Sequence, residues 1–321
     1  MSVGWLFRWI PRREPIPRKP LPLDGGGVGE RVEPVGPTPG AIGLTAALMA
    51  VLLVGARTAS ADQQPLWELG FGGGALQVPD YRGSDRSRVY PYPFVLPYYR
   101  GQVLQSDERG MRGLFFASER VKLDVSLDGS VPVASGDNPA RRGMDDLGPT
   151  IQIGPMLRVL LWGREQGPQQ SLSLNLPLRA AVAFDSGVEH IGYTAYPNLS
   201  YRRDVQLLSG QPWKLTLTAG AMWGSEQYHD YFYQVTAAEA TLERPAYDAS
   251  SGYAGGRLMA TLYRREPRRL WSVYLLYDSV RGAVFDDSPL VESEGGFTVG
   301  FLVAWFPFRS GQSVERSGWD W

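Results

Sequence analysis

The chain has 321 residues, with 32 basic and 33 acidic side chains and no cysteine. The near-balance of charge leaves no basic footprint for nucleic acid, and the lack of cysteine excludes disulfides, thiolate metal sites and cysteine nucleophiles. Glycine (38), tyrosine (16) and tryptophan (10) are plentiful, which suits a β-barrel with aromatic belts but also occurs in soluble β proteins.

An uncharged apolar run, AIGLTAALMAVLLVGA, occupies residues 41–56. It is shorter than the roughly 20 residues that a membrane-spanning helix needs. Basic residues precede it, and Ala59 and Ala61 form an A-x-A cleavage signature before Asp62. We therefore predict that residues 1–61 are a leader and secretory signal peptide, cleaved after Ala61. An N-terminal anchor helix is the alternative, and the true translation start within 1–40 stays open.

Beyond the leader, apolar residues recur at every second position. In QSLSLNLPLRAAVAFD, residues 170–185, the apolar series runs from Leu172 to Phe184, with Asn175 and Arg179 among the residues between. A period of two predicts an extended strand with two unlike faces. The run exceeds the five or six residues usual for a strand. We predict an all-β, antiparallel transmembrane β-barrel, with the leucine face in lipid and Arg179 pointing inward.

The same pattern predicts about twelve strands, with ten as the fallback because the third and fourth are weak. Their ranges are 67–78, 88–100, 102–107, 111–118, 120–131, 148–162, 170–184, 189–204, 211–225, 252–265, 269–281 and 294–308. Connections after even strands are short, whereas long ones follow odd strands at 79–87, 132–147, 226–251 and 282–293. Short periplasmic turns and long outer loops are typical of outer-membrane barrels, and an even count places both termini in the periplasm.

Aromatic residues mark the ends of several apolar faces, as Trp213 and Trp223 do on one predicted strand. Aromatic residues at both ends of an apolar strand face are typical of the aromatic belts at the two membrane interfaces. The last strand, GGFTVGFLVAWFPF, also ends on aromatic residues, which resembles the assembly signal of outer-membrane barrels. A polar tail, 309–321, follows it, so we divide the mature chain into a barrel at 62–308 and this tail.

Three segments carry a family resemblance. They are DYRGSDRSRVYPYPFVLPYYRG (80–101), YHDYFYQVTAAEATLERPAYDASSGY (228–253) and DSPLV (287–291). In this order they resemble the first hairpin, the long loop and the C-terminal end of the MipA/OmpV family of outer-membrane proteins. The family's namesake scaffolds a lytic transglycosylase and a bifunctional penicillin-binding protein, and other members are described as antigens or adhesins. The resemblance therefore implies location more strongly than activity.

Catalytic chemistry has few candidates, because the chain holds only two histidines. His190 has Asp185, Ser186 and Glu189 nearby in sequence, the residue types of a Ser-His-acid nucleophile at the outer rim. The plainer interpretation is a solvated loop histidine. His229, beside Asp230, we expect to be a packing residue of the long loop rather than a base.

The sequence offers only weak candidates for metal and phosphate sites. The run FDDSPLVESE offers Asp286, Asp287, Glu292 and Glu294 to a calcium ion, but such runs are more often solvated loops. GFGGG, at 70–74, lacks the lysine and helix of a phosphate loop. Glycines there let a strand bend or let side chains cross a lumen. We therefore predict no catalytic residue, cofactor or metal.

Charged residues recur on the predicted inward faces. They are Lys122, Asp124, Asp128, Arg158, Arg179, Arg202, Lys214, Arg257 and Asp278. They either line a narrow selective channel or form an ion-pair network that fills a small barrel. Twelve strands leave little lumen compared with the 16–18 of porins, which favours the network.

We predict a monomeric barrel in the Gram-negative outer membrane, surrounded by lipid, that acts as a non-enzymatic scaffold. A scaffold would contact its partners through GREQGPQQ (163–170), RREPRR (264–269) or the C-terminal tail. The alternatives are a narrow channel for small polar solutes and a lipid-modifying barrel enzyme. The sequence names neither the partner nor the solute.

Overall fold

The computed structural model describes residues 64–100, 104–107, 110–113, 116–118, 120–163, 170–185, 187–207 and 212–314, with side chains omitted within 104–117. All of them belong to one compact unit, Leu53–Trp321. The predicted leader and its cleavage site at Ala59 and Ala61 lie outside the described residues. No helix of the described part is long and apolar enough to cross a membrane.

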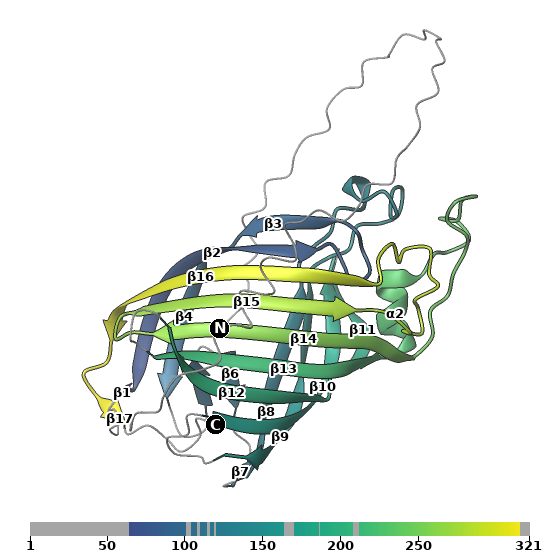
Figure 1. Cartoon of the computed structure of the whole chain (residues 1–321). Helices are drawn as coiled ribbons and strands as arrows, with labels where there is room; N and C mark the ends of the chain where they lie inside the picture. The colour runs from purple at the N-terminus through teal and green to yellow at the C-terminus, as the bar shows by residue number, and fades with distance from the viewer. Residues whose placement is uncertain are drawn as a thin grey trace, which may run out of the picture. The chain divides into compact units, whose positions relative to one another are not determined.

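Twelve antiparallel strands form the main sheet (Figure 1). Three of these strands are each interrupted and so consist of two hydrogen-bonded segments. β3 and β4 pair with β2 in one register, and β11 and β12 both pair with β10 and β13. β6 and β7 are separated by only two residues. Counting each of these pairs once turns fifteen hydrogen-bonded segments into twelve strands, as predicted. The segments are β2 (Trp67–Pro79), β3 (Ser87–Pro91), β4 (Phe94–Arg100), β5 (Leu104–Asp107), β6 (Gly110–Gly113), β7 (Phe116–Ala117), β8 (Val121–Ser130), β9 (Thr150–Trp162), β10 (Gln170–Phe184), β11 (Val188–Ala195), β12 (Asn198–Gln206), β13 (Pro212–Gly224), β14 (Gly252–Arg265), β15 (Arg269–Ser279) and β16 (Gly295–Arg309).

The two ends of the sheet meet in the segment that contains β6 and β7. β6 pairs with β5, whereas β7 pairs with β8, so one short stretch of chain joins the first strands of the barrel to the rest. The first and last long strands also pair, since β2 lies against β16. A membrane-spanning sheet has to close in this way, because hydrocarbon offers no partner to a free backbone group.

The two faces of each strand differ as the sequence predicts. On β10, Ser171, Asn175 and Arg179 are buried, while Leu176 and Leu178 are exposed. Exposed aromatic residues gather at both ends of the outer face, with mostly aliphatic residues between them. One belt contains Trp67, Tyr99, Trp162, Trp305 and Phe308, and the other contains Phe184, Tyr193, Trp223 and Phe297. This is the lipid-facing surface of a transmembrane barrel.

Four long connections gather at one end of the barrel, which we call the cap end. They are residues 80–86, 131–149, 225–251 and 280–294, and together they form the cap. The third contains a helix, α2 (Glu226–Tyr233), that the sequence analysis treated only as loop (Figure 1). Ser225 begins it, because its hydroxyl accepts a hydrogen bond from the backbone N–H of Tyr228. The second contains a 3-10 turn, η1 (Ser135–Asp137).

The opposite end, which we call the short-turn end, holds both described chain termini. β1 (Gln64–Pro65) pairs with β17 (Ser313–Val314), and Leu66 donates from its backbone N–H to the Gln312 carbonyl at 2.9 Å. The start of the polar tail therefore returns along the N-terminal segment instead of leaving the barrel. Residues 315–321 lie outside the described part.

Two neighbouring glycines of β2, Gly72 and Gly73, provide a matched test of how β2 packs in the barrel wall. A Cβ at Gly72 would collide with the Phe94 ring and the Val303 carbonyl oxygen, whereas one at Gly73 would meet only the Tyr92 carbonyl oxygen at 3.9 Å. We expect Gly72→Val to lower the free energy of unfolding by about 1–3 kcal/mol through overpacking. Gly73→Val should have little effect. Urea titration of heat-modifiable gel migration measures both, and equal loss in the two variants would contradict the register of β2.

Candidate functional site

The cap has its own hydrophobic core. The rings of Tyr233, on α2, and Phe285 stack with centroids 3.7 Å apart, and Phe285 and Leu290 are fully buried. Tyr81 and Val133 bring the first and second connections into the same cluster. All four connections therefore contribute to one core, and the cap is a folded element rather than a set of independent loops.

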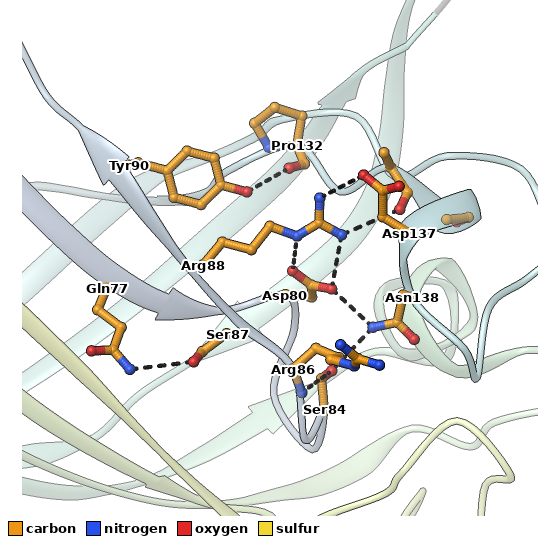
Figure 2. Close-up of polar contacts among 12 residues, drawn as sticks. Gln77, Asp80, Ser84, Arg86, Ser87, Arg88, Tyr90, Pro132, Asp137 and Asn138 are labelled. Atoms are coloured by element: carbon orange, nitrogen blue, oxygen red, sulfur yellow. Dashed lines mark hydrogen bonds and ion pairs between the residues drawn. The ribbon is translucent and has the colours of Figure 1, made fainter. Parts of the chain in front are cut away.

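A buried carboxylate locks the first connection to the second (Figure 2). Asp80, whose side chain has no exposed surface, accepts hydrogen bonds from Arg88 at 2.8 and 3.3 Å and from the Asn138 amide at 2.9 Å. Arg88 also contacts Asp137 at 3.2 Å, but that carboxylate is 73% exposed. Because Asp80 is desolvated, its pairing with Arg88 matters far more to the cap than the exposed pair does.

Further contacts join the remaining connections. The Tyr81 hydroxyl donates to the Leu290 carbonyl at 2.7 Å, and the Ser288 hydroxyl donates to the Tyr233 carbonyl at 2.8 Å. Arg244 donates to the Ala140 carbonyl at 2.8 Å. These residues belong to, or directly contact, the three segments that carry the family resemblance. Those segments, far apart in the sequence, thus meet in the cap.

Arg141 is buried at the centre of this arrangement. It donates to the Ser135 hydroxyl at 3.1 Å, the Phe232 carbonyl at 3.0 Å and the Asp145 carbonyl at 3.3 Å. Burial lowers the pKa of its guanidinium. Arg141 thus ties the second connection to α2 through carbonyl and hydroxyl acceptors.

The two histidines occupy different environments. His229, on α2, is fully buried, and its Nδ1 lies 2.6 Å from the Ser250 carbonyl oxygen. Its buried Nε2 has no hydrogen-bond partner among the residues that the structure describes. Burial lowers the pKa of His229, and the charge of Arg82 adds to this effect. A neutral ring that donates from Nδ1 to Ser250 satisfies these contacts, in keeping with the packing role expected for this residue.

His190 lies exposed on β11, with its ring 4.9 Å from that of Tyr193. Ser186, its candidate nucleophile, falls outside the described residues. Within the described part of the chain, neither histidine has a serine hydroxyl as hydrogen-bond partner. The geometry therefore gives no support to a Ser-His-acid nucleophile at the rim.

A chain of ion pairs runs through the interior. Arg257, on β14, holds Asp278 in a bidentate pair at 2.8 and 2.9 Å, and Arg82 from the cap approaches the same carboxylate at 3.3 Å. On the other side, Arg257 lies 3.6 Å from Asp128 on β8, and Asp128 contacts Arg179 at 3.3 Å. The path β13, β11–β12, β10 and β9 separates β14 from β8 in the sheet, so these contacts cross the lumen. We call this chain the lumen bridge.

The other predicted inward charges lie nearer the short-turn end. Lys122 and Asp124 are each 1% exposed, and Arg158 lies 3.7 Å from Asp124. Lys214, on β13, lies 3.5 Å from Asp204, and Arg202 is half-buried on β12. Their assignment to a channel lining or to an internal network remains a prediction.

A second internal cluster was not predicted. Glu68, only 3% exposed, pairs with Arg100 and with Arg265 at 2.8 Å each. The Arg265 guanidinium lies 3.9 Å from the centre of the Phe306 ring, and Tyr98 packs against the same ring at 4.8 Å. The sequence analysis missed Glu68 because β2 is rich in glycine, and glycines do not show the apolar–polar alternation that reveals which residues face inward.

These contacts reduce the number of arginines that the basic turn at 264–269 exposes at the surface. Arg264 pairs with Glu266 of the same turn at 2.8 Å, and Arg265 points inward to Glu68, so both arginines are half-buried and paired. Of the four arginines of this turn, Arg268 and Arg269 are exposed. The turn is therefore less basic at its surface than the sequence indicates.

The acidic run does not gather around one point. Asp286 accepts from the Gly282 N–H at 2.9 Å, Asp287 accepts from the Tyr247 hydroxyl at 2.7 Å, and Glu294 pairs with Arg281 at 2.9 Å. Among the described residues, no three acidic or histidine side chains come together as a metal site. The run serves the cap through separate contacts.

Comparison with known proteins agrees with this architecture. The family model described as MltA-interacting protein MipA matches residues 71–306. The chain belongs to the MipA family. It is also similar to the outer membrane protein Omp26La of Vibrio anguillarum, with 27% identity over 212 residues, which cover 64% of this chain and 75% of that protein. This member of the MipA family is thus an outer-membrane β-barrel, and its matched region runs from β2 to β16.

The Asp80 lock can be tested against the exposed pair of the same arginine. Asp80→Ala leaves Arg88 without its buried partner, so we expect the cap to lose about 3–5 kcal/mol of stability. Asp137→Ala removes only an exposed contact and should change stability by less than about 1 kcal/mol. The rate of limited proteolysis of the cap, measured in proteoliposomes, compares the two variants. Equal cleavage of both variants would mean that Asp80 does not hold the cap.

His229 makes the cap sensitive to acid. Its folded pKa lies below the ordinary value of 6.5, so the unfolded cap binds the proton more readily than the folded one. Stability is fully present above pH 6.5 and falls as the pH decreases below it. His229→Asn retains a donor for Ser250 but cannot titrate. The decline between pH 6.5 and 5 should disappear in this variant, as measured by hydrogen exchange of α2, and an unchanged decline would exclude His229 as its source.

Proposed function

We propose that this protein is a closed outer-membrane barrel that acts as a non-enzymatic scaffold rather than as a conduit. The lumen bridge is the observation that carries the proposal. Side chains from β8, β10, β14 and β15 meet in the interior, and Arg82 links them to the cap. A solute would have to pass the cap, this network and the cluster around Glu68.

The energetics favour a lumen that stays closed. Two carboxylates and three guanidinium groups are held in contact, and removing one partner from such a buried set typically costs about 3–5 kcal/mol. Opening the lumen would separate several of these pairs at once. A channel of the same width would instead keep its charges apart on the wall, where water could solvate them.

The enzyme alternative lacks support from the histidines. His229 has no access to solvent, and the ring of His190 lies against Tyr193 at the rim. A general base needs hydrogen-bond reach to the group that it deprotonates. The scaffold therefore remains the better proposal for the barrel.

The proposed partners follow from the family. Its description, MltA-interacting protein, supports a lytic transglycosylase as partner, and the family resemblance adds a penicillin-binding protein. We place the contact at the short-turn end, which faces the periplasm if both termini lie there as predicted. Arg268 and Arg269 project from this end and suit an acidic protein surface or the carboxylates of murein.

Conductance in planar bilayers separates scaffold from channel. We expect wild-type protein to insert without single-channel steps, because the lumen bridge blocks the path. The double variant Asp128→Ala with Arg257→Ala removes one charge of each sign from the bridge and should increase leakage. Wild-type steps whose ion selectivity reverses with Arg179→Glu would overturn the proposal in favour of the channel.

Partner binding is tested with purified lytic transglycosylase and protein in proteoliposomes. Arg268→Glu with Arg269→Glu should weaken binding by roughly fivefold to tenfold, since exposed rim charges contribute modestly. Arg281→Glu is the matched control, because Arg281 is similarly exposed but lies in the cap. Equal binding by all three proteins would remove the basic turn from the contact, and no binding by wild type would contradict the scaffold.

A further inference from the structure

The exposed charges at the short-turn end are of one sign. Among the side chains that the structure describes there, every exposed charged group is an arginine: Arg120, Arg268, Arg269 and Arg309. The acidic side chains described at this end are not exposed, and each has a basic partner: Glu68, Asp204 and Glu266. The described surface of the short-turn end is therefore positive.

Three of these arginines lie on neighbouring strands. Arg268 and Arg269 stand at the turn between β14 and β15, and Arg309 is the last residue of β16, which pairs with β15 (Figure 1). The Phe306 N–H donates to the Arg268 carbonyl at 2.9 Å, so the turn lies beside the end of β16. Arg120 precedes β8, on another part of the sheet.

Arg269 lies on the outer face of the barrel. It closes a tight turn with Glu266, since the backbones of the two residues exchange hydrogen bonds at 2.8 and 3.4 Å. The next residue, Leu270, is 5% exposed and points inward, whereas Arg269 is exposed and pairs in register with Trp305, which is 52% exposed. Because successive residues of a strand point to opposite faces, the Arg269 side chain shares the lipid-facing side with Trp305.

The surrounding aromatic residues place this arginine at the membrane interface. Trp67 and Trp305 are exposed members of the aromatic belt at the short-turn end. Ser310, next to Arg309, donates its backbone N–H to the Trp67 carbonyl at 2.9 Å. Tryptophan rings in such a belt sit at the level of the lipid headgroups. Arg269 and Arg309 therefore lie at the height of the phosphate groups of the adjoining leaflet.

Arg264, on the outer face of β14, differs from these two arginines. It pairs with Glu266 at 2.8 Å, and its guanidinium lies 5.9 Å from the centre of the Trp213 ring. Among the described residues, no acidic side chain lies within ion-pair distance of Arg269 or Arg309. The acidic side chain of the turn is thus used by Arg264, and the other two guanidinium groups are available to an anion from outside the protein.

The position of Arg269 favours a lipid headgroup as that anion. A guanidinium group presents several N–H donors in one plane, which match the oxygens of a phosphate. Its aliphatic stem can lie along apolar surface while the charge reaches the headgroup layer. A protein that approaches along the barrel axis meets Arg268 at the tip of the turn, whereas Arg269 faces the bilayer.

We propose that Arg269 and Arg309, beside Trp305, form a site for the phosphate of an anionic phospholipid, which we call the headgroup site. The Arg269 guanidinium binds the phosphate oxygens, and Arg309 adds a second positive charge from the next strand. An anionic lipid is favoured over a zwitterionic one, because the headgroup of the latter brings a positive charge to two arginines. The inference goes beyond the scaffold role and does not depend on it.

Native mass spectrometry of the purified protein in detergent, without a partner protein, tests the headgroup site. The protein is mixed with equal amounts of phosphatidylglycerol and phosphatidylcholine that have the same acyl chains, and the bound lipid is counted. Arg269→Gln with Arg309→Gln removes both charges. Arg120→Gln is the matched control, because it removes an exposed arginine elsewhere at the same end. Heat-modifiable migration shows that each variant is folded, and Arg309→Gln alone replaces the double variant if that one does not fold.

We expect wild-type protein to retain phosphatidylglycerol over phosphatidylcholine by roughly fivefold or more. The preference should fall below about twofold in the double variant and persist in Arg120→Gln. Equal retention of the two lipids by wild type would overturn the proposal, as would an unchanged preference in the double variant. An equal loss in Arg120→Gln would do the same, because the preference would then follow net charge. Displacement of the lipid by excess inorganic phosphate would also contradict it, since the site would then take a free anion.

Discussion

Hydrocarbon offers no hydrogen-bond partner to a backbone N–H or C=O, and this constraint shapes most of the molecule. It requires the sheet to close, which β2 and β16 achieve over a long register while the segment with β6 and β7 joins the other strands. The antiparallel pairing of the described strands follows from this rule.

Closure creates a second problem, because the polar faces of twelve strands point into a narrow interior. In the structure, charged side chains pair with one another across the lumen. Arg257 contacts Asp278 on the neighbouring strand β15 and Asp128 on the distant strand β8, and Arg82 brings the cap into the same network. At the short-turn end, Glu68 and Arg265 repeat the arrangement among aromatic rings. Cap, bridge and lower cluster together argue for an anchor in the membrane.

The sequence predicted the barrel well because strand periodicity is a local signal. Leu176 and Arg179 lie on opposite faces, as the alternation requires, and the long connections fall where the strand ends indicate. It could not predict the contact between Asp80 and Asn138, because these residues are 58 positions apart in sequence, and it missed α2 within the long loop. Nor could it predict that Arg265 turns inward to Glu68, because these two residues are 197 positions apart in sequence.

The contact between Asp128 of β8 and Arg257 of β14 is the most direct link between side chains on opposite sides of the lumen. A double-mutant cycle on urea unfolding in lipid, with Asp128→Ala, Arg257→Ala and the double variant, measures their coupling. The account predicts an interaction energy of about 0.5–3 kcal/mol, as for residues in one buried network. Additive effects of the two substitutions would show that β8 and β14 do not meet, and the barrel would then have an open lumen.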